Sequence, residues 1–366
     1  MQVTCLLTDL RAACRLASRA TTKRSDVRSN VVMHVGDGAI TMVGYDGELE
    51  ICHTITADVS SPGSIAIRAK LLKDAIQTLR TPTVALMSDE SGVLTIQCGT
   101  TTFTLNGCAY DPAHDMATEP QLGSFNVLGD TMRRLIQGTV ACASPVGPSD
   151  ALKGVLTIVD GARVEMVATD AYRLAWAKGA CSTDFVGRQE LIVPARVYRE
   201  VVSMIAARTS DVTVRVGETT VRCSVGSSSV ASRLIQGNYP TWERVIPSTW
   251  STRVVFAQEQ LLAVAKRMAP IARSGTGWLL FDLSAKQCAI CAKNHEVGRS
   301  VELVTPMHYE GNPIVIGLNA GSVLTAIEQC GPGEIAIELR DPELAPVFRS
   351  VGRDDWLGLI MPTRVT

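Results

Sequence analysis

The sequence has few aromatic residues and no marked excess of charge of either sign. Aromatic side chains make up 5% of the 366 residues, so any core is mainly aliphatic. The 35 basic and 36 acidic residues leave a net charge of -1, which argues against a uniformly basic coat but allows one basic face. No apolar run approaches the roughly 18 residues of a membrane span. This length and composition predict a globular protein of two or three domains.

The familiar motifs of catalysis and metal binding are also missing. The sequence has no G-x-x-x-x-G-K-[ST] phosphate loop, no G-x-S-x-G and no H-E-x-x-H. Its five histidines show no ligand spacing. The single C-x-x-C, from Cys288 to Cys291, lies in a strand-like stretch where packing explains it better than zinc. We therefore expect no catalytic residues, no metal and no cofactor.

The 11 cysteines are odd in number and scattered from Cys5 to Cys330, which does not suggest a disulfide framework. The opening residues, MQVTCLLTDL, lack a basic segment followed by a long apolar run, so we expect no signal peptide. These features predict a reduced, cytoplasmic protein whose cysteines are mostly small core residues.

An internal repeat organises the chain. Similar stretches begin at Val3, Phe125 and Val254, 122 and 129 residues apart, which is close to one third of the 366 residues. Each stretch reads as a short strand, a polar turn and an amphipathic helix. A second strand-to-helix stretch and then alternating strands follow in each third, the former starting at Ile65, Leu191 and Ile314. The sequence predicts an α+β protein of three similar domains with two helices each, bounded at 1–122, 123–249 and 250–366.

The first predicted helix separates apolar from basic residues. Leu6, Leu10, Ala13 and Ala17 fall on one arc, and the opposite arc carries Arg11, Arg15 and Arg19, with no acidic residue four positions away. A solvated face is the simpler interpretation. Lys23 and Arg24 follow in the next loop. Basic residues recur on or beside the other helices, except the last: Arg68, Lys70, Lys73, Arg133, Arg134, Arg196, Arg199, Lys266 and Arg267. This recurrence favours a surface that faces phosphate groups.

Residues 168–175, ATDAYRLA, place a hydroxyl, a carboxylate, a phenol and a guanidinium close together. An active site is one hypothesis, but Asp170 has no second carboxylate or histidine beside it in the sequence. The other hypothesis is a turn at the end of the alternating strand RVEMVATD. The residues alone leave both open.

Four stretches carry a resemblance to a known family: VATDAYRLA, LIVPARVYREVV, GNYPTWERVIP and the final LIMPTRVT. With the length and the threefold repeat, they resemble the bacterial DNA polymerase III beta subunit family, the replicative sliding clamps, over the entire chain. The resemblance implies three clamp domains per chain and a homodimeric ring of six domains, with helices lining the hole and sheets outside. It implies a processivity factor without enzymatic activity that encircles duplex DNA.

The resemblance also implies partners and site residues. The partners are the DNA polymerase III alpha subunit, the clamp loader, other polymerases and repair proteins, which bind through linear peptides; no membrane is involved. The peptide groove would comprise Leu152, Thr169, Ala171, Tyr172, Arg173, Leu174, Pro240, Arg244, Val245, Asn319, Ser322, Leu344, Pro346, Val347, Ile360, Met361, Pro362, Thr363 and Arg364. The subunit joint would comprise Phe103 and Leu105 against Pro270 and Ile271 of the other chain.

Some positions depart from the family pattern. Ala171 stands where the family commonly has Gly or Ser, and Ser322 replaces a frequent aromatic residue. The loop 144–153 lacks the tyrosine pair that some members direct at DNA, which leaves Lys153 as its only basic residue. Two alternatives remain. One is an enzyme that uses Asp170, Tyr172 and Arg173, and the other is a diverged accessory clamp paralogue that keeps the ring but has an altered partner set.

Overall fold

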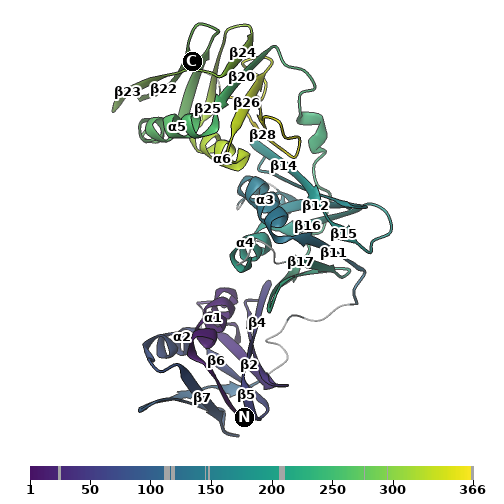
Figure 1. Ribbon diagram of the computed structural model, residues 1–366, viewed down its shortest axis with the longest axis vertical. Helices are drawn as coiled ribbons and strands as arrows, with labels where there is room; N and C mark the ends of the chain where they lie inside the picture. Colours follow the sequence, from purple (N-terminus) through teal and green to yellow (C-terminus); the bar gives the residue numbers. More distant parts are fainter. Residues whose placement is uncertain are drawn as a thin grey trace. The chain divides into compact units, whose positions relative to one another are not determined.

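A computed structural model describes residues 1–23, 26–110, 116, 120–144, 146, 149–205, 211–275, 277–294 and 296–363. The chain divides into two compact units (Figure 1). The first contains residues 1–129, 183–185 and 196–234, and the second contains 130–182, 186–195 and 235–366. None of the helices in the described ranges is long and apolar enough to cross a membrane.

Within these ranges a strand runs directly into a helix six times, at the positions that the repeat predicts. The first set is β1 (Gln2–Leu6) with α1 (Leu7–Ala17), β11 (Gly123–Leu128) with α3 (Gly129–Thr139), and β20 (Thr252–Ala257) with α5 (Gln258–Arg273). The second set is β6 (Gly63–Arg68) with α2 (Ala69–Thr78), β16 (Gln189–Pro194) with α4 (Ala195–Met204), and β25 (Ile314–Asn319) with α6 (Ala320–Cys330). The predicted strand–helix pairs are confirmed.

Three further strands follow every helix, as the alternating patterns predict. They are β2 (Asn30–Gly36), β3 (Ala39–Tyr45), β4 (Leu49–Thr56), β7 (Thr83–Ser88), β8 (Val93–Cys98) and β9 (Thr101–Asn106), then β12 (Gly154–Asp160), β13 (Arg163–Thr169), β14 (Arg173–Ala180), β17 (Asp211–Val216), β18 (Thr220–Val225) and β19 (Ser228–Arg233), and last β21 (Trp278–Leu283), β22 (Cys288–Asn294), β23 (Gly298–Val304), β26 (Glu334–Leu339), β27 (Val347–Ser350) and β28 (Trp356–Ile360). Short strands add to the sheets: β5 (Asp58–Ser61), β10 (Cys108–Ala109), β15 (Ser182–Thr183) and β24 (His308–Gly311).

The sheets run across the domain boundaries that the sequence predicts. The first unit holds the five-stranded sheet β5-β1-β7-β8-β9 and almost all of the ten-stranded sheet β10-β6-β2-β3-β4-β19-β18-β17-β11-β15. The second unit holds the nine-stranded sheet β16-β12-β13-β14-β28-β27-β26-β20-β24 and the four-stranded sheet β23-β22-β21-β25. Strands of the central third join both large sheets, through β19 with β4 and β14 with β28. The two compact units therefore do not follow the thirds of the sequence.

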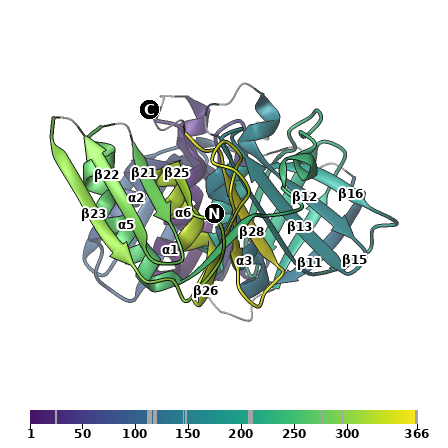
Figure 2. The same ribbon diagram turned by 90° about the horizontal axis from the view of Figure 1, so that it is seen from above.

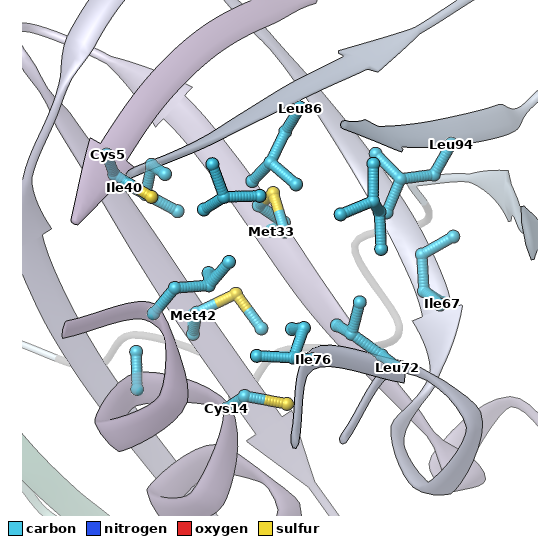
Figure 3. Packing of buried hydrophobic residues seen from close by; sticks show 14 of the residues in the cluster. Cys5, Cys14, Met33, Ile40, Met42, Ile67, Leu72, Ile76, Leu86 and Leu94 are labelled. Carbon is cyan, nitrogen blue, oxygen red and sulfur yellow. The ribbon is translucent and has the colours of Figure 1, made fainter. Parts of the chain in front are cut away.

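Helices cover the sheets in both units. In the first unit, α1 and α2 lie side by side against β3, β4 and β6 (Figure 1). In the second unit, α5 lies against β21 and β22, and α6 against β25, β27 and β28 (Figure 2). The core between α1, α2 and the strands is mainly aliphatic: Ile76 of α2 lies near Leu72 and Met42, and Met33 lies near Leu86 in the same cluster (Figure 3).

The buried face of α1 differs from the predicted arc at its first residue. Leu10, Ala13 and Ala17 are fully buried, but Leu6 is 50% exposed. Leu6 is the last residue of β1, and alternation along that strand turns its side chain outward. Leu7 takes the buried position at the start of the helix instead.

Candidate functional site

The stretch ATDAYRLA forms a tight turn between β13 and β14, and Asp170 holds it. One carboxylate oxygen, Oδ1, accepts the backbone N–H groups of Tyr172 and Arg173, each at 3.0 Å. The other, Oδ2, accepts a hydrogen bond from Arg173 Nε at 2.8 Å. Asp170 is thus fully engaged within the turn, as the structural hypothesis predicts.

Ala171 adopts a conformation that alanine rarely takes. Its φ of 74° lies in the left-handed region, where the Cβ of an L-residue crowds the following carbonyl oxygen. Thr169 supports this geometry, because its Oγ1 accepts the Ala171 N–H and donates to the Arg173 carbonyl oxygen. The turn leaves the Tyr172 side chain 76% exposed.

Residues 360–363 are held beside this turn by backbone hydrogen bonds. Ile360 of β28 pairs with Arg173 of β14, and the Met361 N–H donates to the Tyr172 carbonyl oxygen at 2.7 Å. The Thr363 N–H then donates to Gly317 of β25 at 2.9 Å. The segment therefore links the nine-stranded sheet to the four-stranded sheet.

A groove of about 950 Å³ lies between the turn, this segment and the helices α5 and α6. Eight of the predicted groove residues line it: Tyr172, Arg173, Asn319, Ser322, Ile360, Met361, Pro362 and Thr363. Arg364 lies outside the described residues. The groove thus brings residues of the central and last thirds of the chain together.

The helices α5 and α6 form a wall of the groove that the sequence did not predict. From α5 it comprises Lys266, Ala269, Pro270 and Arg273, and from α6 Gly321, Leu324, Thr325 and Glu328. Both sets recur at three- and four-residue intervals and so form one stripe of each helix. That periodicity is visible in the sequence, but it does not reveal which cavity the stripe lines.

One positive charge in the groove has no ionic partner within the described residues. Lys266 Nζ lies 3.2 Å from Glu328, and Arg173 is held by Asp170. Arg273, at the end of α5, forms no ion pair there. The groove therefore favours a ligand with a negative group next to apolar ones.

The other predicted groove residues do not line this cavity. They are Leu152, Thr169, Ala171, Leu174, Pro240, Arg244, Val245, Leu344, Pro346 and Val347. Leu174 and Val347 are 3% and 2% exposed, in a cluster that includes Trp242. Alternate residues of a strand point to opposite faces, so Arg173 lines this cavity and Leu174 lies in the apolar cluster. Val245 and Leu344 are 53% and 45% exposed.

The predicted DNA-facing residues divide into paired and unpaired side chains. On the first unit, Arg19 Nε lies 2.9 Å from Glu200, and Arg196 pairs with Asp46. Burial raises the pKa of Glu200, and the positive charges of Arg19 and Arg196 oppose that shift. On the second unit the pairs are Arg134–Asp355, Lys153–Asp150, Lys266–Glu328 and Arg267–Glu302. Most of these acidic residues are distant in the sequence from their basic partners, so the pattern of residues along each helix did not predict the ion pairs.

The remaining basic residues have different surroundings. Arg11 donates to carbonyl oxygens at the end of α2, at 3.3 Å from Ile76 and 2.6 Å from Leu79. Arg133 lies on α3, and Arg24 is outside the described residues. Within the described ranges no ion pair engages Arg15, Lys23, Arg68, Lys70, Lys73 or Arg199.

The residues predicted for a subunit joint lie at two places. Phe103 is on β9, an edge strand, and is partly buried against the core of the first unit. Leu105 is 6% exposed and belongs to that core, so Phe103 presents most of the surface of this pair. Pro270 and Ile271 lie near the end of α5.

Cys288 and Cys291 are both buried in β22. Among the residues that the structure describes, no group of three or more His, Cys, Asp or Glu side chains could hold a metal ion.

Three family models match consecutive parts of the chain. All describe the DNA polymerase III beta subunit: its N-terminal domain matches residues 1–115, its central domain 126–241 and its C-terminal domain 243–364. The chain belongs to this family. Its fold is accordingly the α+β fold of three clamp domains, as the resemblance implied.

Relatives and solved structures agree with this assignment. The beta sliding clamp of Pseudomonas aeruginosa is 27% identical over 343 residues, covering 93% of this chain and 92% of the relative. That of Synechococcus elongatus is 25% identical over the full length of both. The DNA polymerase III beta subunit structure from P. aeruginosa matches with a TM-score of 0.92 at 25% identity, and the Bacillus subtilis clamp shares the fold with 0.94 at 22%, each over all of both chains.

The chain is a sliding clamp of DNA polymerase III and a non-catalytic subunit. Asp170, Tyr172 and Arg173 therefore form a structural turn of a non-catalytic subunit, and the hypothesis of an active site is not supported. The comparisons do not favour the alternative of a diverged accessory paralogue.

Proposed function

We propose that this clamp closes around duplex DNA as a homodimer and tethers DNA polymerase III to it. The threefold strand–helix repeat carries the proposal, because two chains supply six similar domains with two helices each. In this proposal the three domains of each chain comprise residues 1–122, 123–249 and 250–366. The helices of the six domains line the hole, and the sheets form the outer wall.

A ring holds DNA by topology, so its contacts need not recognise bases. Phosphate contacts of weakly held basic side chains are then sufficient, and they do not stop sliding. Several predicted DNA-facing residues have an acidic neighbour, such as Arg19 with Glu200 and Arg267 with Glu302. These pairs lower the positive charge that faces the phosphates and so keep the contacts weak.

Edge strands supply the subunit joint in this proposal. β9 is an edge of the five-stranded sheet and β23 an edge of the four-stranded sheet. Pairing β9 of one chain with β23 of the other would satisfy free backbone groups and hide two aggregation-prone edges. Val301 and Leu303 of β23 are 46% and 61% exposed, so such pairing would also bury apolar surface. Phe103 would then approach the α5 end that carries Pro270 and Ile271.

The groove beside Tyr172 is the proposed docking site for partner peptides. Those partners are the DNA polymerase III alpha subunit, the clamp loader, other polymerases and repair proteins. Met361 is 45% exposed, and its flexible thioether can adapt to different apolar side chains. Arg273 provides a positive charge for an acidic group of the peptide. Grooves of this type bind through a few anchor residues.

The dimer is tested by light scattering at micromolar concentration. We expect a mass near twice the chain mass of 39.2 kDa. The substitution Phe103→Arg should shift the protein toward monomer, since it places a charge in the apolar joint. Leu128→Arg is the matched control, because Leu128 is 63% exposed on β11, outside the proposed joint. A wild-type mass near 39.2 kDa would contradict the proposal.

A further inference from the structure

The turn that borders the groove has a counterpart in the first unit. Between β3 and β4, Asp46 Oδ1 accepts the backbone N–H groups of Glu48 and Leu49 at 3.0 and 2.9 Å. Between β13 and β14, Asp170 Oδ1 accepts the N–H groups of the residues two and three positions on in the same way. Each turn leads into a strand that joins the next third of the chain, β4 with β19 and β14 with β28. The repeat therefore places equivalent turns beside equivalent sheet joints.

The start of a helix lies beside each of these turns. α4 begins at Ala195 directly after β16, and α6 begins at Ala320 directly after β25. The second residue of α4 is Arg196, which forms an ion pair with Asp46 of the turn. The second residue of α6 is Gly321, which lines the groove. The same position of the repeat thus carries an arginine in one unit and no side chain in the other.

In the first unit two arginines occupy the space beside the turn. Arg196 pairs with Asp46 and also donates to the Arg19 carbonyl oxygen at 3.2 Å. Arg19 reaches α4 in the opposite direction, with its Nε 2.9 Å from Glu200 and its Nη1 donating to Ser203 Oγ at 2.9 Å. The side chains of Asp46 and Glu200 are each only 11% exposed. These contacts tie the first third of the chain to the central third.

The corresponding positions of the second unit carry short, neutral residues. Counted from the starts of the equivalent helices, Ala141 stands in the place of Arg19, Gly321 in that of Arg196 and Thr325 in that of Glu200. Gly321 and Thr325 both line the groove of about 950 Å³. The groove therefore lies where the first unit has its paired side chains.

Arg173 explains why α6 needs no arginine at its start. The turn acid has a second carboxylate oxygen, and in the second unit this oxygen accepts from Arg173 Nε at 2.8 Å. In the first unit the position of Arg173 is taken by Leu49, which is 1% exposed, so the guanidinium for Asp46 comes from α4 instead. A charge-assisted hydrogen bond thus satisfies the acid in both units. Its donor lies within the turn in the second unit, which leaves the helix start free.

The backbone does not require glycine at position 321. Gly321 lies in α6 and is not among the glycines with a positive φ. Apart from its own helix, a Cβ at this position would have one neighbour within 4 Å, Asn319 Oδ1 at 3.3 Å. A longer side chain therefore has room to extend into the groove that Gly321 lines.

We propose that Gly321 determines whether the groove can accept a peptide. Its missing side chain keeps open, in the second unit, the space that Arg196 and Arg19 fill in the first. The first unit is thus a closed counterpart of the docking site, and its two arginines act as a brace. The proposal rests on the proposed docking of partner peptides at this groove.

The role of Gly321 is tested with a fluorescent clamp-binding peptide of the DNA polymerase III alpha subunit. Gly321→Arg introduces the residue of the closed counterpart, and we expect a loss of peptide affinity of at least roughly tenfold. Gly321→Gln fills the space without a charge and should lose affinity to a similar extent. Gly321→Ala adds only a methyl group, so we expect a change below about threefold. Full affinity in both filled variants would overturn the proposal.

The matched control for charge is Gln260→Arg. Gln260 is exposed on the neighbouring helix α5 and does not line the groove. It should leave peptide affinity unchanged. A loss in Gly321→Arg and Gln260→Arg but not in Gly321→Gln would show that charge decides, and would also overturn the proposal. Light scattering and thermal unfolding show whether each variant is a folded dimer, and Gly321→Gln carries the test if Gly321→Arg is not.

The brace in the first unit is tested separately. Arg196→Ala should lower the midpoint of thermal unfolding and leave peptide affinity unchanged, because its ion pair lies away from the groove. Arg199→Ala, at an exposed arginine of the same helix, is the control and should lower the midpoint less. Equal midpoints for the two variants would contradict the brace.

Failure of this proposal is distinguishable from failure of the docking function. A wild type that does not bind the peptide removes the docking function and the role of Gly321 with it. A wild type that binds, together with unimpaired Gly321→Arg and Gly321→Gln variants, leaves docking in place and removes only the role of Gly321.

Discussion

Arg173 Nε donates a hydrogen bond to Asp170 Oδ2 at 2.8 Å, across the turn that joins β13 to β14. The other oxygen of Asp170 accepts the backbone N–H groups of Tyr172 and Arg173. The acid therefore shapes the turn that presents Tyr172 at the groove. The Tyr172 carbonyl oxygen in the same turn accepts the Met361 N–H, so the turn positions both Tyr172 and Met361 at the groove.

Replacing Asp170 should destabilise the second unit. Asp170→Ala leaves two backbone donors and Arg173 without their partner, and we expect a loss of about 1–3 kcal/mol in the free energy of unfolding. Urea unfolding measures it. In a double-mutant cycle, Arg173→Ala should add little once Asp170 is gone. Strictly additive losses would show that the two side chains act separately.

Ala171→Gly should stabilise the protein by about 1 kcal/mol, since glycine takes a φ of 74° without the steric penalty of alanine. The control is Ala168→Gly, in the regular strand just before the turn, which should destabilise because glycine weakens a strand and leaves a small void. The urea midpoint reports both. A lower midpoint for Ala171→Gly would contradict the strain that the turn implies.

Glu200→Gln should raise affinity for duplex DNA at low salt, because it releases Arg19 from its ion pair. The salt slope should steepen by about one. Glu218→Gln changes the net charge equally on an exposed loop residue and is the control. Burial raises the pKa of Glu200, so mild acidification should protonate it early and release Arg19 in the wild type but not in the variant. Identical effects of both substitutions would contradict this account of Arg19.

Deleting the chain from Met361 onward should weaken a clamp-binding peptide of the polymerase at least roughly tenfold while leaving the dimer intact. The deletion removes Met361, Pro362 and Thr363 from the groove, whereas all residues proposed for the joint, including Pro270, which also lines the groove, remain in place. Met361→Ala should show part of the loss. Met307→Ala, at a methionine 58% exposed outside the groove, should show none. Fluorescence anisotropy measures the affinities, and wild-type binding by the truncated dimer would rule out this groove.

Local patterns predicted the fold closely. Strand-to-helix transitions such as that from β6 to α2 follow from a change of hydrophobic period, which depends only on neighbours in the sequence. The joining of β4 to β19 is different. It is a pairing of two strand edges far apart in the chain, and either strand alone carries no sign of it.

The candidate site was predicted less completely, for two physical reasons. Ion pairs form between residues that only the fold brings together, as for Arg19 and Glu200, so counting acids four positions away could not find them. Strand alternation also divided the expected groove, placing Arg173 at the cavity and Leu174 in an apolar cluster on the opposite face. A family motif identifies both Arg173 and Leu174 but does not show on which face of the sheet each side chain lies.

Encirclement is tested most directly by retention on closed and open DNA. The clamp is loaded onto nicked circular duplex with a bacterial clamp loader and ATP, washed at high salt, and the DNA is then cut once. We expect the clamp to stay on the circle at salt that removes ordinary electrostatic binders, and to leave once the DNA has ends. Equal retention before and after cutting, with both ends free, would contradict the account.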